Sequence, residues 1–223
     1  MKFSSTTIIA IGAGLVAAGG AFVWSAMAEQ SDTPPPLQAA NTETAIFAGG
    51  CFWCTEADFD KVDGVVATVS GYTGGRVDNP SYRQVTGGDT GHYEAVQVTY
   101  EPSRVSYEEL VDYYFRTIDP TDDRGQFCDK GSSYLSAVFV EDEDERAIVE
   151  SEIEEIEASG VLPGPIVTRV LDEATFWEAE DYHQNYYKTT PVKYRFYRQG
   201  CGRDARLEDL WGDDAMKLPG GTS

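Results

Sequence analysis

Apolar residues recur along the chain with two periods, one typical of strands and one typical of helices. Val96, Val98 and Tyr100 alternate with polar neighbours, which is the pattern of a half-buried strand. Over 107–118 the apolar residues recur every three or four positions, behind a capping box formed by Ser106 and Glu109, which indicates an amphipathic helix. The pattern predicts strands over 44–47, 65–69, 96–100 and 135–140, and helices over 51–59 and 107–118.

The order of these segments predicts the fold. They follow one another as strand, helix, strand, strand, helix, strand, which is the ferredoxin-like split βαβ arrangement of the α+β class. We expect a mainly antiparallel sheet with helices packed on it. A further helix over 142–159, ending at Gly160, and a strand over 166–171 follow. The remainder, 172–218, is aromatic and rich in turns, and we expect a loop-rich extension there.

The N-terminal residues have a different composition. No charged residue occurs from Phe3 to Ala28, and Ala26-Met27-Ala28 has the small-x-small form of a signal-peptidase site. Residues 1–28 are therefore expected to be a signal peptide or, if uncleaved, a membrane anchor, and the proline-rich residues 29–43 a flexible linker. Both alternatives predict an exported protein, in the periplasm or on the extracytoplasmic face of the membrane. The main folded domain is expected over 44–199, with a C-terminal tail over 200–223.

Charge excludes one class of partner. The 223 residues include 38 acidic and 17 basic side chains, which gives a formal net charge of -21. Nucleic acids and anionic lipid surfaces are polyanions, so we expect neither nucleic-acid binding nor membrane contact beyond the N-terminal segment. The acidic stretch 141–157 is expected to be a solvated helix face.

The residues best suited to a chemical reaction are the two cysteines of the segment Gly49-Gly50-Cys51-Phe52-Trp53-Cys54. A strand, a glycine turn and a helix start put Cys51 at a helix N-terminus, where free N–H groups and the helix dipole lower the pKa of a thiol. The two glycines would let another molecule approach the sulfur. Cys54 lies one helical turn further on, within reach for a disulfide. Cys51 is therefore predicted to be a nucleophile and Cys54 its resolving thiol, with Phe52 and Trp53 suited to line an apolar pocket.

Two other interpretations of the cysteines stay open. Cys51 and Cys54 could be a buried structural pair, although export exposes thiols to oxidation. The four cysteines Cys51, Cys54, Cys128 and Cys201 could bind zinc, although only one close pair exists where structural zinc sites usually use two. A zinc-stabilised binding module is therefore a competing function, and a general envelope thiol–disulfide oxidoreductase is another. The latter would place its Cys-x-x-Cys on a thioredoxin-like fold, which the predicted element order disfavours.

Over 44–212 the chain resembles the type A peptide methionine sulfoxide reductases. The matching blocks are Gly50-Cys51-Phe52-Trp53-Cys54-Thr55-Glu56, Ser70-Gly71-Tyr72-Thr73-Gly74-Gly75, Gly88-Asp89-Thr90-Gly91-His92-Tyr93-Glu94, Ile118-Asp119-Pro120-Thr121, Gly125-Gln126-Phe127-Cys128-Asp129 and Ala179-Glu180-Asp181-Tyr182-His183-Gln184. Six blocks in order are far more specific than the Cys-x-x-Cys alone. Cys128 and Leu135 depart from the family, which commonly has Asn and Arg there.

The resemblance implies that the domain over 44–199 is catalytic and reduces methionine-(S)-sulfoxide, free and in proteins, to methionine. Cys51 matches the family's nucleophile and Glu94 the acid that protonates the sulfoxide oxygen. The matching substrate-binding residues are Phe52 and Trp53 around the methyl group, the phenols Tyr82 and Tyr134, and the polar Asp129. A buried Glu94 would need a raised pKa to carry its proton near pH 7.

The expected cycle oxidises Cys51 to a sulfenic acid, which a second thiol converts to an intramolecular disulfide. A thioredoxin-like donor, or another dithiol, reduces that disulfide, so no bound cofactor and no metal are expected. Cys54 ranks first as the resolving thiol, Cys201 second because the tail could bring it to the site, and Cys128 is a neighbour of Asp129. Partners are expected to be oxidised proteins, free methionine sulfoxide and the reductant, with the chain a monomer. His92 and His183 are expected to be structural rather than catalytic bases.

Overall fold

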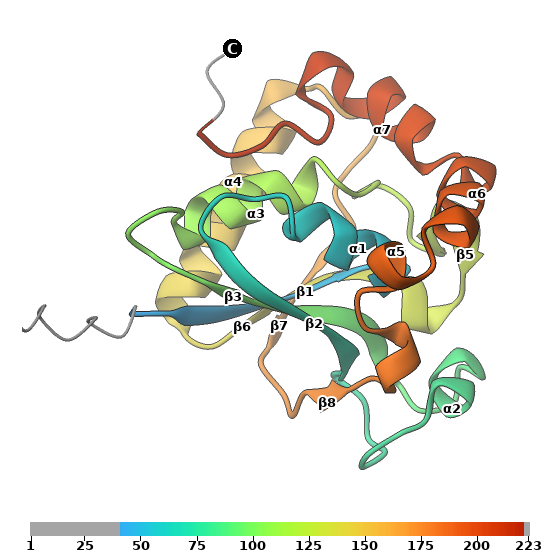
Figure 1. Ribbon diagram of the computed structural model, residues 1–223. Coiled ribbons are helices and arrows are strands. Elements are labelled where there is room, and N and C mark those ends of the chain that lie inside the picture. Colours follow the sequence, from blue (N-terminus) through green and yellow to red (C-terminus); the bar gives the residue numbers. More distant parts are fainter. Residues whose placement is uncertain (1–40, 221–223) are drawn as a thin grey trace, which may run out of the picture. The chain divides into compact units, whose positions relative to one another are not determined.

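The computed structural model describes residues 41–220 and contains one main sheet. Six strands are hydrogen-bonded in the order β7–β6–β1–β3–β2–β8 (Figure 1). All neighbouring pairs are antiparallel except β6 and β7. The strands are β1 (Glu43–Gly49), β2 (Val65–Thr73), β3 (Tyr93–Tyr100), β6 (Ser136–Val140), β7 (Arg169–Asp172) and β8 (Trp177–Glu178).

The ferredoxin-like prediction is confirmed. The strands of the repeated unit stand in the order β6–β1–β3–β2, so that β3 separates β1 from β2 and β1 separates β3 from β6. Helix α1 (Phe52–Phe59) connects β1 to β2, and α3 (Tyr107–Phe115) connects β3 to β6. This is the split βαβ arrangement, and it is not that of a thioredoxin-like Cys-x-x-Cys enzyme.

Alternation along the strands separates two apolar layers. Phe47, Val98 and Val138 face the helices and form one buried cluster with residues of α1, α3 and α4 (Glu143–Ser159). Ile46 and Phe139, their neighbours along β1 and β6, belong to a smaller cluster on the opposite face. The cores therefore follow the period of two that the strands impose.

The predicted helix ends are also found. Ser106 accepts from the backbone N–H of Glu109, and the Glu109 side chain accepts from the N–H of Ser106. Helix α4 begins after Asp142, whose carboxylate caps it, and ends at Gly160 in the left-handed conformation with φ 67°. Strand β7 begins at Arg169, three residues later than expected.

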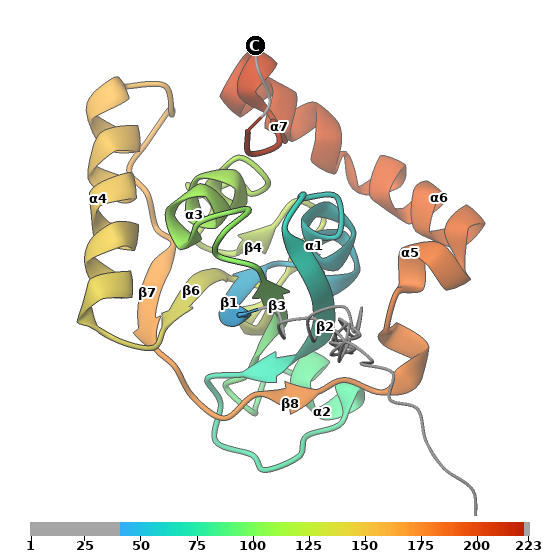
Figure 2. The same cartoon turned by 60° about the vertical axis from the view of Figure 1, so that its left-hand side comes forward.

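The C-terminal segment contains more helix than the sequence pattern suggested. Helix α5 (Tyr186–Thr189) leads into α6 (Pro191–Cys201) and α7 (Arg203–Trp211), which lie over α1 and α3 (Figure 2). The expected start of a tail at residue 200 falls inside α6, and Leu207, Leu210 and Trp211 are buried in the main core. The segment is therefore loop-rich only between β7 and α5.

The short elements lie mainly at the sheet ends. They are α2 (Tyr82–Thr86), the hairpin of β4 (Gly125–Gln126) and β5 (Asp129–Lys130), and 3-10 turns at Ser132–Tyr134, Asp181–His183 and Gly212–Asp214. The expected signal peptide or anchor over 1–28, and the linker up to residue 40, lie outside the described residues. Within 41–220, no helix has both the length and the apolar character needed to cross a bilayer.

Candidate active site

A tight turn at Gly50 connects β1 to α1 and presents Cys51. Gly50 has φ 82°, and a Cβ placed on it would lie 2.5 Å from Cβ of Gln126. A Cβ on Gly49 would lie 2.8 Å from Oγ1 of Thr55. The two glycines thus allow the turn to pack against Gln126 and α1, rather than opening the sulfur to another molecule as the sequence had suggested.

The residues predicted to be catalytic or substrate-binding meet around one small cavity, whereas the predicted resolving cysteines Cys54 and Cys201 do not line it. Cys51 precedes the first residue of α1, is only 6% exposed, and faces a cavity of about 50 Å³. The lining residues come from α1, α2, β3, the β5 region and α6. They are Cys51, Phe52, Trp53, Tyr82, Glu94, Asp129, Tyr134 and Tyr197.

Glu94 is held as a buried acid beside this cavity. It is 1% exposed on β3, and its Oε2 accepts the backbone N–H of Phe52 at 3.1 Å. Its other oxygen has no hydrogen-bond partner among the described residues. Burial raises the pKa of Glu94 to about 8, so the group is mainly protonated at pH 7. A neutral carboxyl with an unengaged oxygen can donate its proton to a ligand in the cavity.

The resting state of Cys51 differs from the expectation. Burial raises the pKa of the Cys51 thiol well above its usual value, and its hydrogen bond to Cys54 and the charges of Cys54 and Glu94 raise that pKa further. The N–H of Phe52, the first in the helix, is bonded to Glu94 rather than free for the sulfur. The helix start therefore does not produce a thiolate at Cys51 in the free protein, because desolvation outweighs it.

Cys54 shows the opposite shift. The hydrogen bond that it accepts from Cys51 lowers the pKa of the Cys54 thiol, and although burial acts against it, Arg203 and Arg198 lower that pKa further. Both Cys51 and Cys54 are free thiols and both are buried. Cys54 therefore loses its proton more easily than Cys51, and the two thiols lie within hydrogen-bonding reach of each other.

Aromatic rings form the cavity wall, and a histidine fixes them. The Trp53 ring stacks on Tyr186 with centroids 3.8 Å apart, and its Nε1–H donates to Nδ1 of His183 at 3.0 Å. Burial lowers the pKa of His183, which keeps the ring neutral and able to accept this bond. His92 accepts the N–H of Gly75 at 3.1 Å. In both histidines Nδ1 is thus engaged as an acceptor, and neither residue lines the cavity.

Tyr197 is a site residue that the sequence analysis missed. It lies on α6, and its hydroxyl donates to the Asp129 carboxylate. Its hydroxyl also interacts with the Cys51 sulfur and acts to lower the pKa of that thiol. Tyr197 lies one helical turn before Cys201, so recognising α6 as a helix would have placed both residues on one face. Tyr82 and Tyr134 are half-buried, and burial raises the pKa of Tyr82 to about 12, so both stay protonated donors.

The remaining cysteines are joined to each other. Cys128 and Cys201 form a disulfide, with Cys128 in the turn between β4 and β5 and Cys201 as the last residue of α6. Cys201 is thus anchored in a helix, not carried by a flexible tail. Two of the four sulfurs are not available as thiolate ligands, so the described residues do not form the four-cysteine zinc site.

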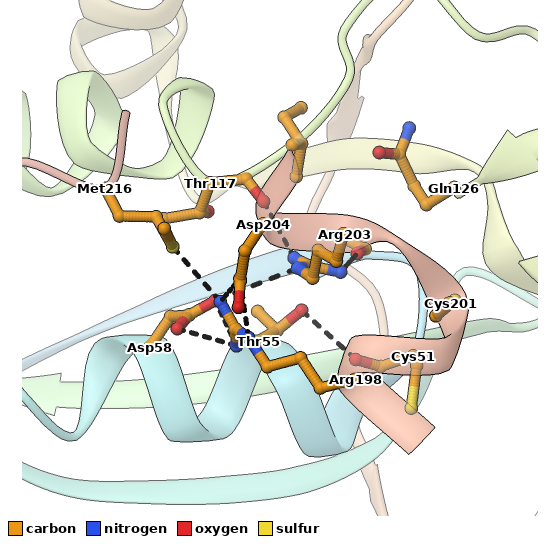
Figure 3. A network of polar contacts seen from close by, with 12 residues as sticks. Cys51, Thr55, Asp58, Thr117, Gln126, Arg198, Cys201, Arg203, Asp204 and Met216 are labelled. Atoms are coloured by element: carbon orange, nitrogen blue, oxygen red, sulfur yellow. Dashed lines mark hydrogen bonds and ion pairs between the residues drawn. The ribbon is translucent and has the colours of Figure 1, made fainter. Parts of the chain in front are cut away.

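A buried ion-pair network connects α6 and α7 to the helix that begins at Cys51 (Figure 3). Asp58 of α1 is fully buried and accepts from Arg198 of α6 at 2.9 Å, and Arg203 of α7 lies 3.8 Å away. Arg203 also donates to the carbonyl of Gly49 at 3.2 Å and to that of Thr117 at 2.8 Å. The network sets the position of the Cys201 end of α6 relative to Cys51.

The matched block around Glu180 has a structural part in the site. Its carboxylate accepts from the Tyr72 hydroxyl at 2.9 Å and from the N–H of Tyr82 at 3.0 Å. The Gln184 side chain pairs with the backbone of Ser70 at 3.0 and 2.9 Å. These bonds hold the C-terminal segment against β2 and fix the start of α2, and so place Tyr82 at the cavity with the His183 ring packed beside it.

Comparisons with known proteins agree with this geometry. Residues 43–215 match the family described as Peptide methionine sulfoxide reductase. The chain is 52% identical to Peptide methionine sulfoxide reductase MsrA 2 of Rhizobium meliloti over 81% of this chain and 89% of the relative, and 50% identical to MsrA 2 of Caulobacter vibrioides over 84% and 95%. It is also 46% identical to MsrA/MsrB of Vibrio cholerae, of whose length it spans 51%.

Solved structures show the same fold. Methionine sulfoxide reductase A of Corynebacterium diphtheriae superimposes with a TM-score of 0.62 at 35% identity, covering 70% of this chain and 77% of that one. Reduced Mxr1 of Saccharomyces cerevisiae gives 0.64 at 33% identity, covering 69% and 88%. The buried acid, the free thiol and the aromatic cavity therefore occur in a fold that matches these solved structures. The chain belongs to the type A peptide methionine sulfoxide reductases, which are oxidoreductases.

Proposed function

We propose that this protein reduces the S epimer of methionine sulfoxide, free and in oxidised proteins, with Cys51 as nucleophile and Glu94 as acid. The observation that carries the proposal is the neutral Glu94 carboxyl, with one unengaged oxygen, at the same small cavity as the Cys51 thiol. A sulfoxide oxygen leaves poorly until it is protonated, and a carboxyl with a pKa of about 8 supplies that proton near neutral pH.

The chemical step balances without a cofactor. The Cys51 sulfur attacks the sulfoxide sulfur, Glu94 protonates the oxygen, and the oxygen passes to Cys51. The substrate sulfur gains two electrons and leaves as methionine, while Cys51 loses two and becomes a sulfenic acid. The Cys51 thiol supplies the proton that restores Glu94. Phe52 and Trp53 pack against the methyl group, and the hydroxyls of Tyr82 and Tyr134 donate to the oxygen.

A second thiol then converts the sulfenic acid to a disulfide and releases water. Cys54 is the first choice, because it lies within hydrogen-bonding reach of Cys51 and its pKa is lowered. A protein dithiol of the thioredoxin kind returns the two electrons. Tandem mass spectrometry of the reduced enzyme after one turnover without reductant will show a Cys51–Cys54 linkage. A Cys51–Cys201 linkage with no Cys54 bond would transfer this role to Cys201.

The main test is stereospecific turnover with a dithiol donor. The wild-type chain is expected to reduce a methionine-S-sulfoxide peptide and to leave the R epimer unchanged. Cys51→Ser is expected to abolish the reaction, and Glu94→Gln to slow methionine release in a single turnover by about a hundredfold or more. Glu150→Gln, which changes an exposed carboxyl on α4, serves as the matched control. Full activity of Cys51→Ser, or reduction of the R epimer alone, would contradict the proposal.

We also propose that repair takes place outside the cytoplasm. The uncharged run up to Ala28 and the Ala26-Met27-Ala28 sequence support export. Fractionation of cells that express the full chain tests this: the protein is expected in the periplasm or on the outer face of the membrane, and recovery in the cytoplasm alone would contradict it.

A further inference from the structure

The Cys128–Cys201 disulfide has two unequal ends. Cys128 is exposed at the turn of the β4–β5 hairpin, whereas Cys201 is half-buried where α6 ends. Phe127, just before Cys128, has a positive φ of 52°, and the Arg203 guanidinium lies 4.6 Å from the centroid of its ring. The turn is therefore held in one conformation that leaves Cys128 at the surface.

Polar groups around the disulfide favour negative charge on only one of the sulfurs. The backbone N–H of Cys128 donates to Sγ of Cys201 at 3.2 Å, and a hydrogen bond to sulfur stabilises a thiolate. The Asp129 carboxyl has its Oδ2 3.8 Å from each of the two sulfurs. Tyr197 donates to this carboxyl and connects it to the Cys51 end of the site.

We propose that Cys128 is the point at which electrons enter the protein: an external dithiol donor attacks Sγ of Cys128, and Cys201 is the sulfur that leaves. Thiol–disulfide exchange requires access to the attacked sulfur and proceeds faster when the leaving thiolate is stabilised. Cys128 has the access, and Cys201 has the stabilising N–H. Cys201 is half-buried at the end of α6 and is therefore the less accessible of the two residues.

Each step balances in atoms and electrons. The donor thiol bonds to Cys128, the Cys128–Cys201 bond breaks, and the proton of the donor thiol passes to the Cys201 sulfur, for which the Asp129 carboxyl is an adjacent carrier. The second donor thiol then attacks the mixed disulfide, which releases Cys128 as a thiol and the donor as its own disulfide. Cys201, now reduced, is available for exchange with oxidised Cys51 or Cys54.

This inference rests on the proposed function for its place in the cycle, but its test needs no sulfoxide. The full chain carrying the Cys128–Cys201 disulfide is mixed with a thioredoxin whose second active-site cysteine is replaced by serine, so that the mixed disulfide persists. Acid quenching at early times, alkylation of free thiols and peptide mass spectrometry then locate the adduct. Early times are needed because the freed Cys201 can move the adduct by later exchange.

The donor is expected on Cys128 in at least about tenfold excess over Cys201 when extrapolated to zero time, with Cys201 alkylated. An adduct mainly on Cys201, or none on either sulfur, would overturn the inference. The same experiment on Cys54→Ser is expected to give the same site, because Cys54 is outside this disulfide. If the adduct forms on Cys128 while the protein reduces no sulfoxide, the proposed function fails and the electron-entry site stands.

Discussion

At the residue scale, the active site keeps two ionisable groups neutral by burying them together. Desolvation is the largest contribution to the raised pKa of both Glu94 and Cys51. While Glu94 and Cys51 are both neutral, neither places a charge at the cavity. Under the proposed function, a sulfoxide that accepts the proton of Glu94 would favour ionisation of the Cys51 thiol. Because the thiolate is the reactive form of cysteine, a neutral Cys51 thiol is expected to react slowly with general oxidants.

The first prediction concerns the charge coupling between these groups. Glu94→Gln is expected to lower the pKa of the Cys51 thiol, because above pH 8 the Glu94 carboxylate opposes a second negative charge. The pH dependence of Cys51 alkylation, followed by mass spectrometry, measures this pKa, with Glu150→Gln as control. An unchanged or raised pKa would show that the two groups do not interact.

Tyr197→Phe is expected to act in the opposite direction. Its hydroxyl acts to lower the pKa of the Cys51 thiol, so its removal is expected to raise that pKa. The same alkylation experiment at Cys51 tests this, and a lower pKa in Tyr197→Phe would contradict it. Together the two variants distinguish specific coupling from a general loosening of the site, which would shift both in one direction.

Sequence blocks located most of the site, but not its electrostatics. Five of the eight cavity residues lie in the matched blocks, the family resemblance also assigned Tyr82 and Tyr134, and only Tyr197 was missed. The expected low pKa of Cys51 was wrong, since a helix start favours a thiolate only where the N–H groups are free and water is near. Neither condition can be read from the order of residues, because Glu94 is 42 positions away from the N–H that it occupies.

At the scale of elements, helices with apolar stripes were predictable and α6 was not. Its buried residues are Tyr194 and Arg198, so the inward-facing stripe includes an arginine. Hydrophobic periodicity does not register a buried cation, whose partner Asp58 is 140 residues away. The strand order and the helices α1, α3 and α4 follow from local patterns, whereas α6 depends on a long-range ion pair.

The Gly50 turn leads to a prediction at this scale. Gly50→Ala is expected to destabilise the protein and to displace Cys51, because the turn has φ 82° and the new Cβ would meet Gln126 at 2.5 Å. Gly200→Ala is the matched control, since nothing lies within 4 Å of its Cβ position and alanine favours helix α6. The urea concentration at the unfolding midpoint and the rate of sulfoxide turnover are expected to fall for Gly50→Ala and to stay unchanged for Gly200→Ala. Equal urea stability and equal turnover of the two variants would contradict the packing role of Gly50.

At the scale of the whole molecule, the Asp58 network connects the C-terminal helices to the rest of the fold. Burial acts to raise the pKa of Asp58, but Arg198, Arg203 and Lys61 outweigh it and hold the pKa below its usual value. A carboxyl with a depressed pKa stabilises the folded state above its unfolded pKa, and this contribution is lost as the pH falls through the folded pKa. Acid is therefore expected to loosen the contact between α6, α7 and α1.

Asp58→Asn is expected to lower the free energy of unfolding by about 3–5 kcal/mol, because it leaves buried guanidinium groups without their counter-charge. Asp209→Asn, on the exposed side of α7, is the control and is expected to have little effect. Urea denaturation near neutral pH, with the disulfide intact in every sample, measures the difference. A loss below about 1 kcal/mol would mean that the arginines find other partners.

The Cys128–Cys201 bridge also closes a covalent ring around a large part of the chain, because 73 positions separate its ends. A crosslink of that span restricts the unfolded chain by an amount worth about 4 kcal/mol in a chain-entropy estimate. The disulfide-bonded form is therefore expected to be more stable than the reduced form, and under the proposed cycle each reduction of this bond would lower the stability for a short time. Resistance to heat and proteases is thus expected to be greatest under the oxidising conditions that keep this bond closed, which are also the conditions that oxidise methionine.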